Sequence, residues 1–230
     1  MRPGAPSAES AGELLGRFHA RVADLDPSSL TVTLPGFHDL RRRRAQLEAA
    51  VAADPLGRAA AAAEEIGAAR AASALVEAAE DLTRSVPRRV AHNDAKLDNV
   101  VFRHGRAVCL VDLDTVMPGA WFWDVGDLLR TAGTAAAEDE VPAPAASVDP
   151  VLYGAVLTGY RRAVRAGSAQ PAELDALALA GAVVTYEQAL RFLADWLAGD
   201  VYYRTLRPDQ NLERARAQLH LLATMPRVAL

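Results

Sequence analysis

The sequence predicts a mainly helical α+β fold with one small β hairpin. The helices are predicted by an alanine-rich region over 56–82 and by three segments near the end of the chain whose apolar residues recur at helical spacing. The hairpin is predicted by two short β-prone runs, 100–102 and 108–111, on either side of a turn that contains Gly105. The 230 residues are 51% hydrophobic, which is enough to bury a sizeable core.

The beginning of the chain predicts a short lead and then helices. Residues 1–8 are rich in Pro, Gly and Ser and predict a disordered lead before one domain over 9–230. A helix follows, with Ser10 as its expected N-cap and His19 expected on its surface. After a loop, the basic run 41–44 indicates a solvated helix face rather than a phosphate site.

The central stretch carries the candidate chemistry. His92, Asp94 and Asn99 form a His-x-Asp-x-x-x-x-Asn pattern, and Asp112 ends the second hairpin strand. Pairing of the hairpin strands would bring Asn99 close to Asp112, because the first strand begins where the second one ends. These residues therefore indicate one site.

Their residue types suit phosphoryl transfer. That reaction needs a carboxylate to orient or deprotonate the attacking hydroxyl, and Asp94 suits this role. Mg²⁺ keeps several waters and takes one or two protein carboxylates, so the oxygens of Asn99 and Asp112 would suffice to hold it. The structural alternative is that Asp94 and Asn99 cap turns and that Asp112 merely ends a strand.

The rest of the chain is expected to be helical after a turn at the Pro-Gly pair 118–119. A helix is expected to open at Asp127, and the acidic run 138–140 indicates either a solvated loop or a direct role in the site. The expected closing helices span 148–166, 171–198 and 209–224.

Arg191 lies among apolar positions of the middle closing helix, where an unpaired guanidinium would be costly. It therefore needs an anionic or polar partner. Glu187 or Asp195, each one turn away, or a ligand would serve, and the pair within the helix is preferred on physical grounds.

Composition excludes some partners. The net charge of -4 and the pI near 5.8 argue against nucleic acid. The single cysteine, Cys109, lies in an apolar run, so we expect a buried structural thiol in a reducing compartment. The sequence contains no apolar core of a signal peptide and no run long enough to span a membrane, so we expect a cytoplasmic protein without a membrane partner.

The central motifs resemble the aminoglycoside phosphotransferase and choline kinase superfamily, which is related to protein kinases. Within it the chain is most similar to the N-acetylhexosamine 1-kinase branch, from about residue 10 to the end. The similar segments are 92–100, 111–119, 123–127, 134–140, 191–195 and 199–202.

The resemblance implies the C-terminal lobe of a protein kinase-like phosphotransferase fold. ATP would be the phosphoryl donor, Mg²⁺ the cofactor and the anomeric hydroxyl of an N-acetylhexosamine the acceptor. In such a kinase Asp94 would be the catalytic base, and Asn99 and Asp112 would bind Mg²⁺.

The resemblance also implies supporting roles. His92 and Asp127 would support the catalytic loop, Asp127 by accepting backbone N–H bonds, and Asp124 is open to the same interpretation. The residues that would contact the sugar are Asp114, Arg191 and Tyr202.

One part of the superfamily pattern is not found. These kinases place a glycine-rich strand pair and usually a lysine over the phosphates, before the helical lobe. Here the catalytic motif begins at His92 after segments that predict helices, and the only lysine is Lys96, inside that motif. We therefore expect the N-terminal ATP-binding lobe to be missing and the chain alone to be inactive or very slow.

Two hypotheses follow. The chain is the C-terminal lobe of a sugar kinase whose other lobe was lost through the choice of chain boundaries, a misplaced start or a gene truncation. Alternatively, it is a free-standing sugar-binding or partner-binding module without a competent nucleotide site. An aminoglycoside or choline-like acceptor also stays open, because the catalytic loop is shared among these kinases.

Overall fold

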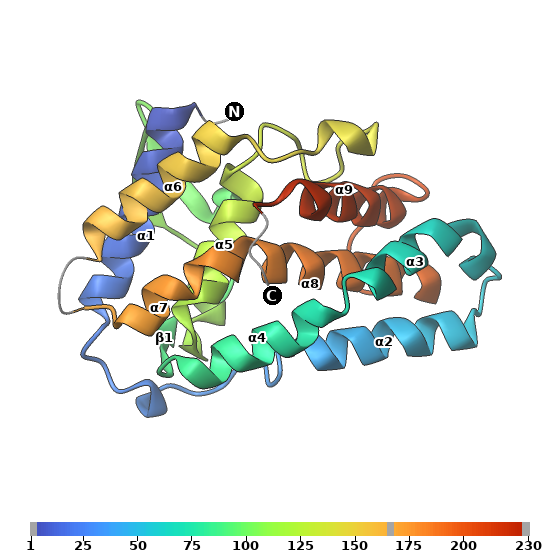
Figure 1. The fold of residues 1–230 in the computed structure, drawn as a ribbon, viewed down its shortest axis with the longest axis horizontal. Helices are drawn as coiled ribbons and strands as arrows, with labels where there is room; N and C mark the ends of the chain where they lie inside the picture. Colours follow the sequence, from blue (N-terminus) through green and yellow to red (C-terminus); the bar gives the residue numbers. More distant parts are fainter. Residues whose placement is uncertain (1–3, 165–167, 227–230) are drawn as a thin grey trace.

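The structure, a computed structural model, describes residues 4–164 and 168–226. It is mostly helical and has two small antiparallel sheets (Figure 1), so the predicted α+β class with a hairpin is confirmed. The α-helices are α1 (Ala5–Arg21), α2 (Leu40–Ala53), α3 (Ala63–Ala71), α4 (Ala74–Ser85), α5 (Trp121–Ala132), α6 (Pro150–Ala163), α7 (Pro171–Asp175), α8 (Leu177–Ala198) and α9 (Gln210–Thr224). The strands are β1 (Arg89–Ala91), β2 (Val100–Arg103), β3 (Arg106–Leu110) and β4 (Met117–Gly119). The short 3₁₀ helices are η1 (Pro27–Ser29), η2 (Ala59–Ala62), η3 (Leu97–Asn99), η4 (Leu113–Thr115) and η5 (Ala143–Ala145).

Helix α8 organises the larger part of the fold. It contacts α2, α3, α4, α5 and α9, and in Figure 1 it runs between α9 and the α2–α4 pair. Most of its residues are buried, including Val184, Leu190 and Leu193, because the helix is apolar on nearly all faces. A rigid helix at this place can carry site residues from its C-terminal half.

Helices α1 and α6 form a second, very close pair. A Cβ atom added at Gly12 would lie 2.1 Å from the carbonyl oxygen of Val156. One added at Gly159 would lie 2.0 Å from the carbonyl oxygen of Glu9. Only glycine leaves room for backbones this close, so these two residues set the distance between the helices.

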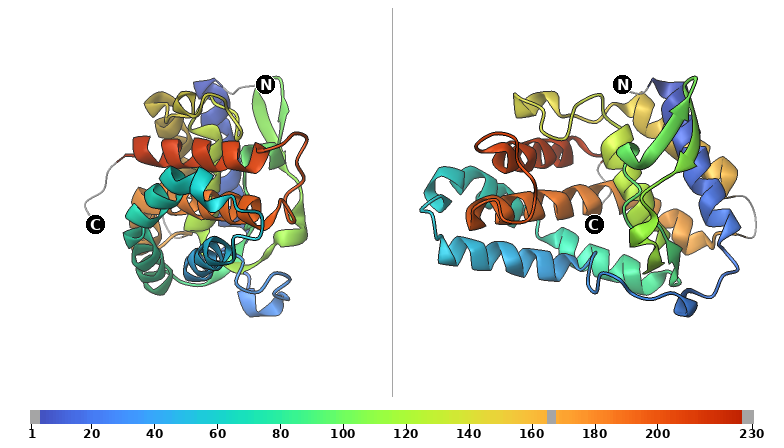
Figure 2. Two further views of the ribbon diagram at one scale, coloured as in Figure 1. Left: turned by 90° about the vertical axis from the view of Figure 1, so that its right-hand side faces the viewer. Right: turned by 180° about the vertical axis from the view of Figure 1, so that it is seen from behind.

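The predicted hairpin is confirmed and packs against α1 (Figure 2). Strand β2 pairs with β3, with Val100 opposite Leu110 and the turn at His104 and Gly105. The amide of Ala107 donates to Ser10 Oγ at 3.0 Å, from inside α1. Ser10 is therefore not the N-cap that the sequence analysis expected, and it anchors the hairpin instead.

A second sheet, whose strand pairing the sequence did not predict, holds the loop that carries His92 and Asp94. Strands β1 and β4 pair antiparallel, with Val90 opposite Pro118. The indole N–H of Trp121 donates to the carbonyl of Val90 at 2.9 Å, which joins this sheet to the start of α5. The loop that follows β1 is therefore held next to α5.

Two expected element boundaries are wrong. The lead expected over residues 1–8 is already helical from Ala5, and Ala8 is fully buried against the core, so packing extends α1 toward the terminus. Residues 1–3 of that lead lie outside the described part. The helix expected to open at Asp127 begins at Trp121, because Trp121, Phe122 and Trp123 are all buried in the core and continue its apolar face.

The burial of Cys109 was also predicted incorrectly, since its thiol is exposed. The hairpin is a two-stranded sheet that covers the core with one face only. An irregularity between Val101 and Phe102 shifts the pairing, and Val108 and Cys109 both face away from the core.

The closing helices largely follow the predicted spans. Gly199 ends α8 in the left-handed conformation, with φ of 102°, as expected of a C-terminal glycine. The expected helix 171–198 is divided into α7 and α8 at Ala176. The last residues of the expected span 148–166 lie partly outside the described part, and α6 ends at Ala163. Within the described ranges, none of the helices is both long and apolar enough to cross a bilayer.

Candidate active site

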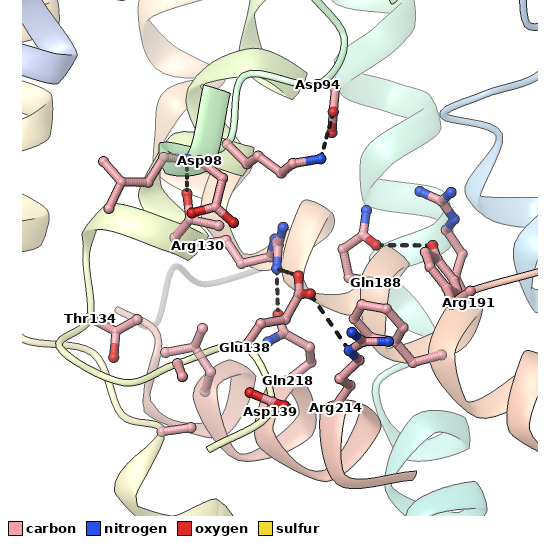
Figure 3. A pocket seen from close by; sticks show the side chains of 18 of the residues that line it. Asp94, Asp98, Arg130, Thr134, Glu138, Asp139, Gln188, Arg191, Arg214 and Gln218 are labelled. Carbon is pink, nitrogen blue, oxygen red and sulfur yellow. Dashed lines mark hydrogen bonds and ion pairs between the residues drawn. The ribbon is translucent and has the colours of Figure 1, made fainter. Parts of the chain in front are cut away.

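A cavity of about 890 Å³ lies between the catalytic loop, the 134–139 loop, α8 and α9 (Figure 3). It brings together residues that are far apart in the sequence, because the hairpin, α5 and α8 converge there. The predicted site residues that line it are Asp94, Asp112, Asp114, Arg191 and Tyr202. His92, Asn99 and Asp127 lie behind its wall and are buried.

The two carboxylate oxygens of Asp94 have different surroundings. Oδ2 accepts from Lys96 Nζ at 2.7 Å and from Asn99 Nδ2 at 2.9 Å. Among the described residues, Oδ1 has no hydrogen-bond partner, and the side chain is 24% exposed. Burial by itself lowers the pKa of Lys96, but the hydrogen bond and charge of Asp94 outweigh it, so the pKa lies above its ordinary value. Asp94 therefore has one fixed oxygen and one that is free to accept from a ligand.

The hairpin places Asn99 beside the segment that ends in Asp112. The amide of Val111 donates to the carbonyl of Asn99 at 3.0 Å, one residue before Asp112. Asn99 uses its amide nitrogen to bind the Asp94 carbonyl at 2.8 Å, and its Oδ1 accepts no hydrogen bond from the described residues.

These donors fit a hard divalent cation. The carboxylate of Asp112 likewise has no hydrogen bond or ion pair within the described part of the chain, and φ of 64° turns the backbone there into the left-handed region. One amide oxygen and one carboxylate oxygen are the ligands that Mg²⁺ takes beside water and phosphate. In the described ranges no group of three or more His, Cys, Asp or Glu side chains forms a metal site, so water and phosphate would complete the shell.

The buried carboxylate of Asp124 holds the catalytic loop. It accepts the backbone N–H of His92 at 2.8 Å and that of Asn93 at 2.6 Å. The bonds that the sequence analysis assigned to Asp127 are therefore made by Asp124, three residues earlier on α5. The pKa of Asp124 is lowered: burial raises it, but the hydrogen bonds from His19 and from the loop amide outweigh that effect.

The third partner of Asp124 is His19, which the sequence analysis wrongly placed on the helix surface. Its side chain is fully buried, Nε2 lies 2.8 Å from Asp124 Oδ2 and Nδ1 lies 2.9 Å from the hydroxyl of Tyr160. A carboxylate only accepts, so Nε2 carries the proton and Nδ1 accepts from Tyr160. Burial holds the pKa of His19 below its ordinary value, against the opposing effect of Asp124.

His92 connects the loop to the hairpin. Its Nε2 lies 3.0 Å from the carbonyl of Val111, and its Nδ1 lies 3.4 Å from the amide nitrogen of Asp94. The carbonyl accepts and the amide donates, so the ring is neutral with its proton on Nε2. These contacts tie the loop to the hairpin, and the supporting role of His92 stays a prediction.

Asp127 instead belongs to a buried polar cluster under the cavity. Its Oδ1 accepts from Arg130 at 2.8 Å, and Arg130 also donates to Glu138 at 2.8 Å and to Gln218 at 3.3 Å. Figure 3 shows the Arg130 guanidinium with its contacts to Glu138 of the 134–139 loop and to Gln218 of α9. Burial lowers the pKa of Arg130, but the charges of Asp127 and Glu138 outweigh it and raise the pKa.

The acidic run 138–140 is therefore more than a solvated loop. Glu138 is tied to Arg130, and Asp139 accepts from Arg207 at 3.0 Å and from Gln210 at 2.9 Å. These contacts hold the loop as a wall of the cavity.

Arg191 does not form the predicted pair within α8. Asp195 is used by the backbone amides of residues 201–203 and by Asn211, and no carboxylate of the described residues forms an ion pair with Arg191. Its guanidinium carbon instead lies 5.2 Å from the ring centre of Phe37, 5.4 Å from that of Tyr203 and 5.8 Å from that of Tyr202. Since Asp195 is used elsewhere and Glu187 forms no ion pair with Arg191 in the described part of the chain, a ligand is the one partner from the sequence analysis that is still open for Arg191.

Glu187, the other predicted partner of Arg191, is used by a histidine and an arginine. Its side chain is fully buried and bonds to His38 Nδ1 at 2.8 Å, and Arg43 Nε lies 3.6 Å from its second oxygen. The solvated face predicted for residues 41–44 is therefore wrong for Arg43, whose side chain is only 15% exposed.

Sequence reasoning missed His19, His38, Arg43 and Arg130. A signal existed for His19, which follows Leu15 by four residues and so shares the buried face of α1. No comparable signal existed for His38, which lies in an irregular loop between η1 and α2.

A helical lobe whose His-x-Asp-x-x-x-x-Asn loop faces a polar cavity defines a phosphotransferase-like protein. The family model described as the phosphotransferase enzyme family (APH) matches residues 2–168, most of the chain. The protein belongs to this family.

Proposed function

We propose that the cavity holds a sugar acceptor and that the protein takes part in ATP-dependent phosphoryl transfer to it. The acceptor that we infer is an N-acetylhexosamine, phosphorylated on its anomeric hydroxyl. The observation that carries the proposal is the free Oδ1 of Asp94, which is exposed in the cavity while Oδ2 is fixed by Lys96 and Asn99.

In this proposal each residue acts through its own geometry. Asp94 Oδ1 accepts the acceptor hydroxyl proton and orients the oxygen for attack. Asp124 and His92 keep the loop in place during this step. Asn99 and Asp112 would hold Mg²⁺, which when bound neutralises charge on the transferred phosphoryl group.

The part of the cavity wall around Arg191 favours a neutral polar acceptor over a cationic one. Arg191 has no anionic partner in the described part of the chain, and its charge would repel a choline or an aminoglycoside. Tyr202 and Tyr203 beside it offer aromatic faces for the apolar side of a sugar ring, and Gln188 offers an amide for hydroxyl groups. Asp114 also lines the cavity and is exposed.

The reaction also needs a part that covers the triphosphate. The described segments before β1 are helices and loops, without the glycine-rich strand pair that related kinases use. The proposal therefore places this part outside the described residues, and it expects residues 1–230 alone to turn over far below ordinary kinase rates, which are about 1 to 100 per second.

The lack of a glycine-rich strand pair in the described segments also favours a second function, in which the protein binds a sugar or a partner without phosphorylating the sugar. Isothermal calorimetry separates the two. It would be run with Mg-ATP and, separately, with N-acetylglucosamine, N-acetylgalactosamine, choline and an aminoglycoside.

Binding of a hexosamine but not of Mg-ATP supports an acceptor lobe that needs a nucleotide-binding part. Tight binding of Mg-ATP would contradict our proposal that the part covering the triphosphate lies outside the described residues. Binding of choline or the aminoglycoside in preference to both sugars would contradict an N-acetylhexosamine as the acceptor. Binding of none of these compounds would contradict the proposed function.

A further inference from the structure

The side chain of His38 connects the catalytic loop to α8. Its Nε2 lies 3.1 Å from the carbonyl oxygen of Asn93, and its Nδ1 lies 2.8 Å from Glu187 Oε2. The ring is stacked on Trp123 of α5, with ring centres 4.7 Å apart and an interplanar angle of 6°. The side chain is 10% exposed and that of Glu187 is fully buried, so water does not replace these contacts.

Both partners of the ring can only accept hydrogen bonds. A backbone carbonyl and a carboxylate have no proton to donate, and a neutral imidazole has a single N–H. Both contacts are satisfied together only when each ring nitrogen carries a proton. We propose that His38 is held as an imidazolium and that, in this form, it positions the peptide that carries Asp94.

The peptide bond between Asn93 and Asp94 is the group that is positioned. Its carbonyl accepts from His38, and its N–H faces His92 Nδ1 at 3.4 Å. Asn93 has φ of 64°, a left-handed conformation that residues other than glycine adopt less readily. The side-chain amide of Asn93 donates to the carbonyls of Ala91, Thr115 and Met117, and its backbone bonds to His38 and Asp124 add to these contacts, so together they fix this conformation.

The surrounding charges favour the imidazolium. Glu187 faces His38 from α8, and Asp124 and Asp127 lie on α5. Arg43 Nε lies 3.6 Å from the second oxygen of Glu187, and the charge of Arg191 also acts on this carboxylate. Burial lowers the pKa of His38, but the charge and hydrogen bond of Glu187, aided by Asp124 and Asp127, outweigh burial and raise it above its ordinary value.

His38 is thus a positioning residue for Asp94, and its catalytic meaning rests on the proposed function. Its protonation and its effect on the loop do not, because both are measurable without nucleotide or sugar. If the calorimetry shows binding of neither Mg-ATP nor any of the acceptors, the proposed function is overturned, and the test of His38 is unaffected.

The test is nuclear magnetic resonance of the whole chain, labelled with ¹⁵N, from about pH 6 to about pH 9. Both ring nitrogens of His38 are expected to carry protons at about pH 7, and one proton is expected to be lost above the ordinary pKa of about 6.5. As pH rises and His38 loses this proton, hydrogen exchange of the Asn93 amide, corrected for its intrinsic pH dependence, is expected to become about tenfold faster. We call this change in the exchange rate with pH the exchange step.

Variants separate positioning from simple packing. His38→Phe keeps a ring to stack on Trp123, and it should show fast exchange at every pH and no step. Glu187→Gln keeps an acceptor for Nδ1 but removes the charge, so the step should move to lower pH. His220→Gln, on α9 and without a hydrogen bond in the described part of the chain, is the matched control and should leave the step unchanged.

Two results would overturn the proposal. One is a His38 ring with a single protonated nitrogen at about pH 7 in the wild type. The other is an exchange step at Asn93 that persists in His38→Phe.

Discussion

The backbone N–H of Asn93 donates to the carboxylate of Asp124 at 2.6 Å, across 31 residues of sequence. The same carboxylate binds the amide of His92 and the ring of His19, so one buried charge joins α1, α5 and the catalytic loop. The geometry of the residue next in the chain, Asp94, depends on this contact.

Replacing this charge should weaken the whole fold. Asp124→Asn keeps one acceptor oxygen but presents an NH₂ group to a second donor, which leaves a buried amide unsatisfied. We expect the free energy of unfolding to fall by about 2 to 4 kcal/mol. Urea unfolding measures this change. Asp98→Asn, on the exposed surface of η3, should change it by less than about 0.5 kcal/mol. Equal effects of the two substitutions would contradict the assignment.

The two buried histidines should give stability opposite dependences on pH. The pKa of His19 is lowered in the folded protein by burial, so as pH falls below about 6.5 the unfolded chain takes up a proton that the folded chain does not, and stability is lost. The pKa of His38 is raised, so its contribution is fully present below about 6.5 and is lost as pH rises through the folded pKa.

Urea unfolding at several pH values tests this pair of signs. His19→Gln should flatten the loss of stability between about pH 6.5 and about pH 5, and His38→Phe should flatten the loss above about pH 6.5. A wild-type curve without slope on either side would show that neither histidine titrates as described.

The contact of α1 with α6 predicts a contrast between two glycines of the same helix. Gly159→Ala places a methyl group against the Glu9 carbonyl and should cost about 2 to 3 kcal/mol, because two helix backbones must separate. Gly154→Ala meets no atom within 4 Å and should instead stabilise the protein by about 0.5 to 1 kcal/mol through helix propensity. Thermal or urea unfolding of both variants measures the contrast, and a tolerated Gly159→Ala would refute the close contact.

Asp94→Asn tests the proposed chemistry. The neutral amide cannot take the proton of an acceptor hydroxyl, so phosphoryl transfer should fall by about 10² to 10⁴-fold. The assay is transfer from ATP to an N-acetylhexosamine, in the longest form of the protein that shows turnover. Asp175→Asn, exposed on α7, should keep the wild-type rate. A rate that survives Asp94→Asn would remove this residue from the reaction.

Arg191→Met tests the acceptor wall. Methionine keeps an apolar chain beside Phe37 and Tyr203 but removes the donors and the charge. We expect the dissociation constant of the sugar to rise at least about tenfold, as for the loss of a hydrogen bond from a charged group. Calorimetry measures this change, with Arg161→Met on the exposed face of α6 as the control. Unchanged affinity would place the sugar elsewhere.

Several features were predictable because consecutive residues encode them. The hairpin follows from two β-prone runs around Gly105, and Gly199 marks the end of α8. The grouping of Asp94, Asn99 and Asp112 follows from the same hairpin, since strand pairing relates its two ends. The early start of α5 was missed because its first turn consists of large aromatic residues, whose helical state depends on burial.

The sequence by itself therefore determined the helical class, the hairpin and the position of the His-x-Asp-x-x-x-x-Asn loop, because periodicity and turn chemistry are local. Only the tertiary structure decided which polar groups meet: His19 with Asp124 across 105 residues, and His38 with Glu187 across 149. A buried charge must find a partner wherever the fold brings one near, and the local pattern does not specify that partner. For this reason Asp124, rather than Asp127, holds the loop that presents Asp94.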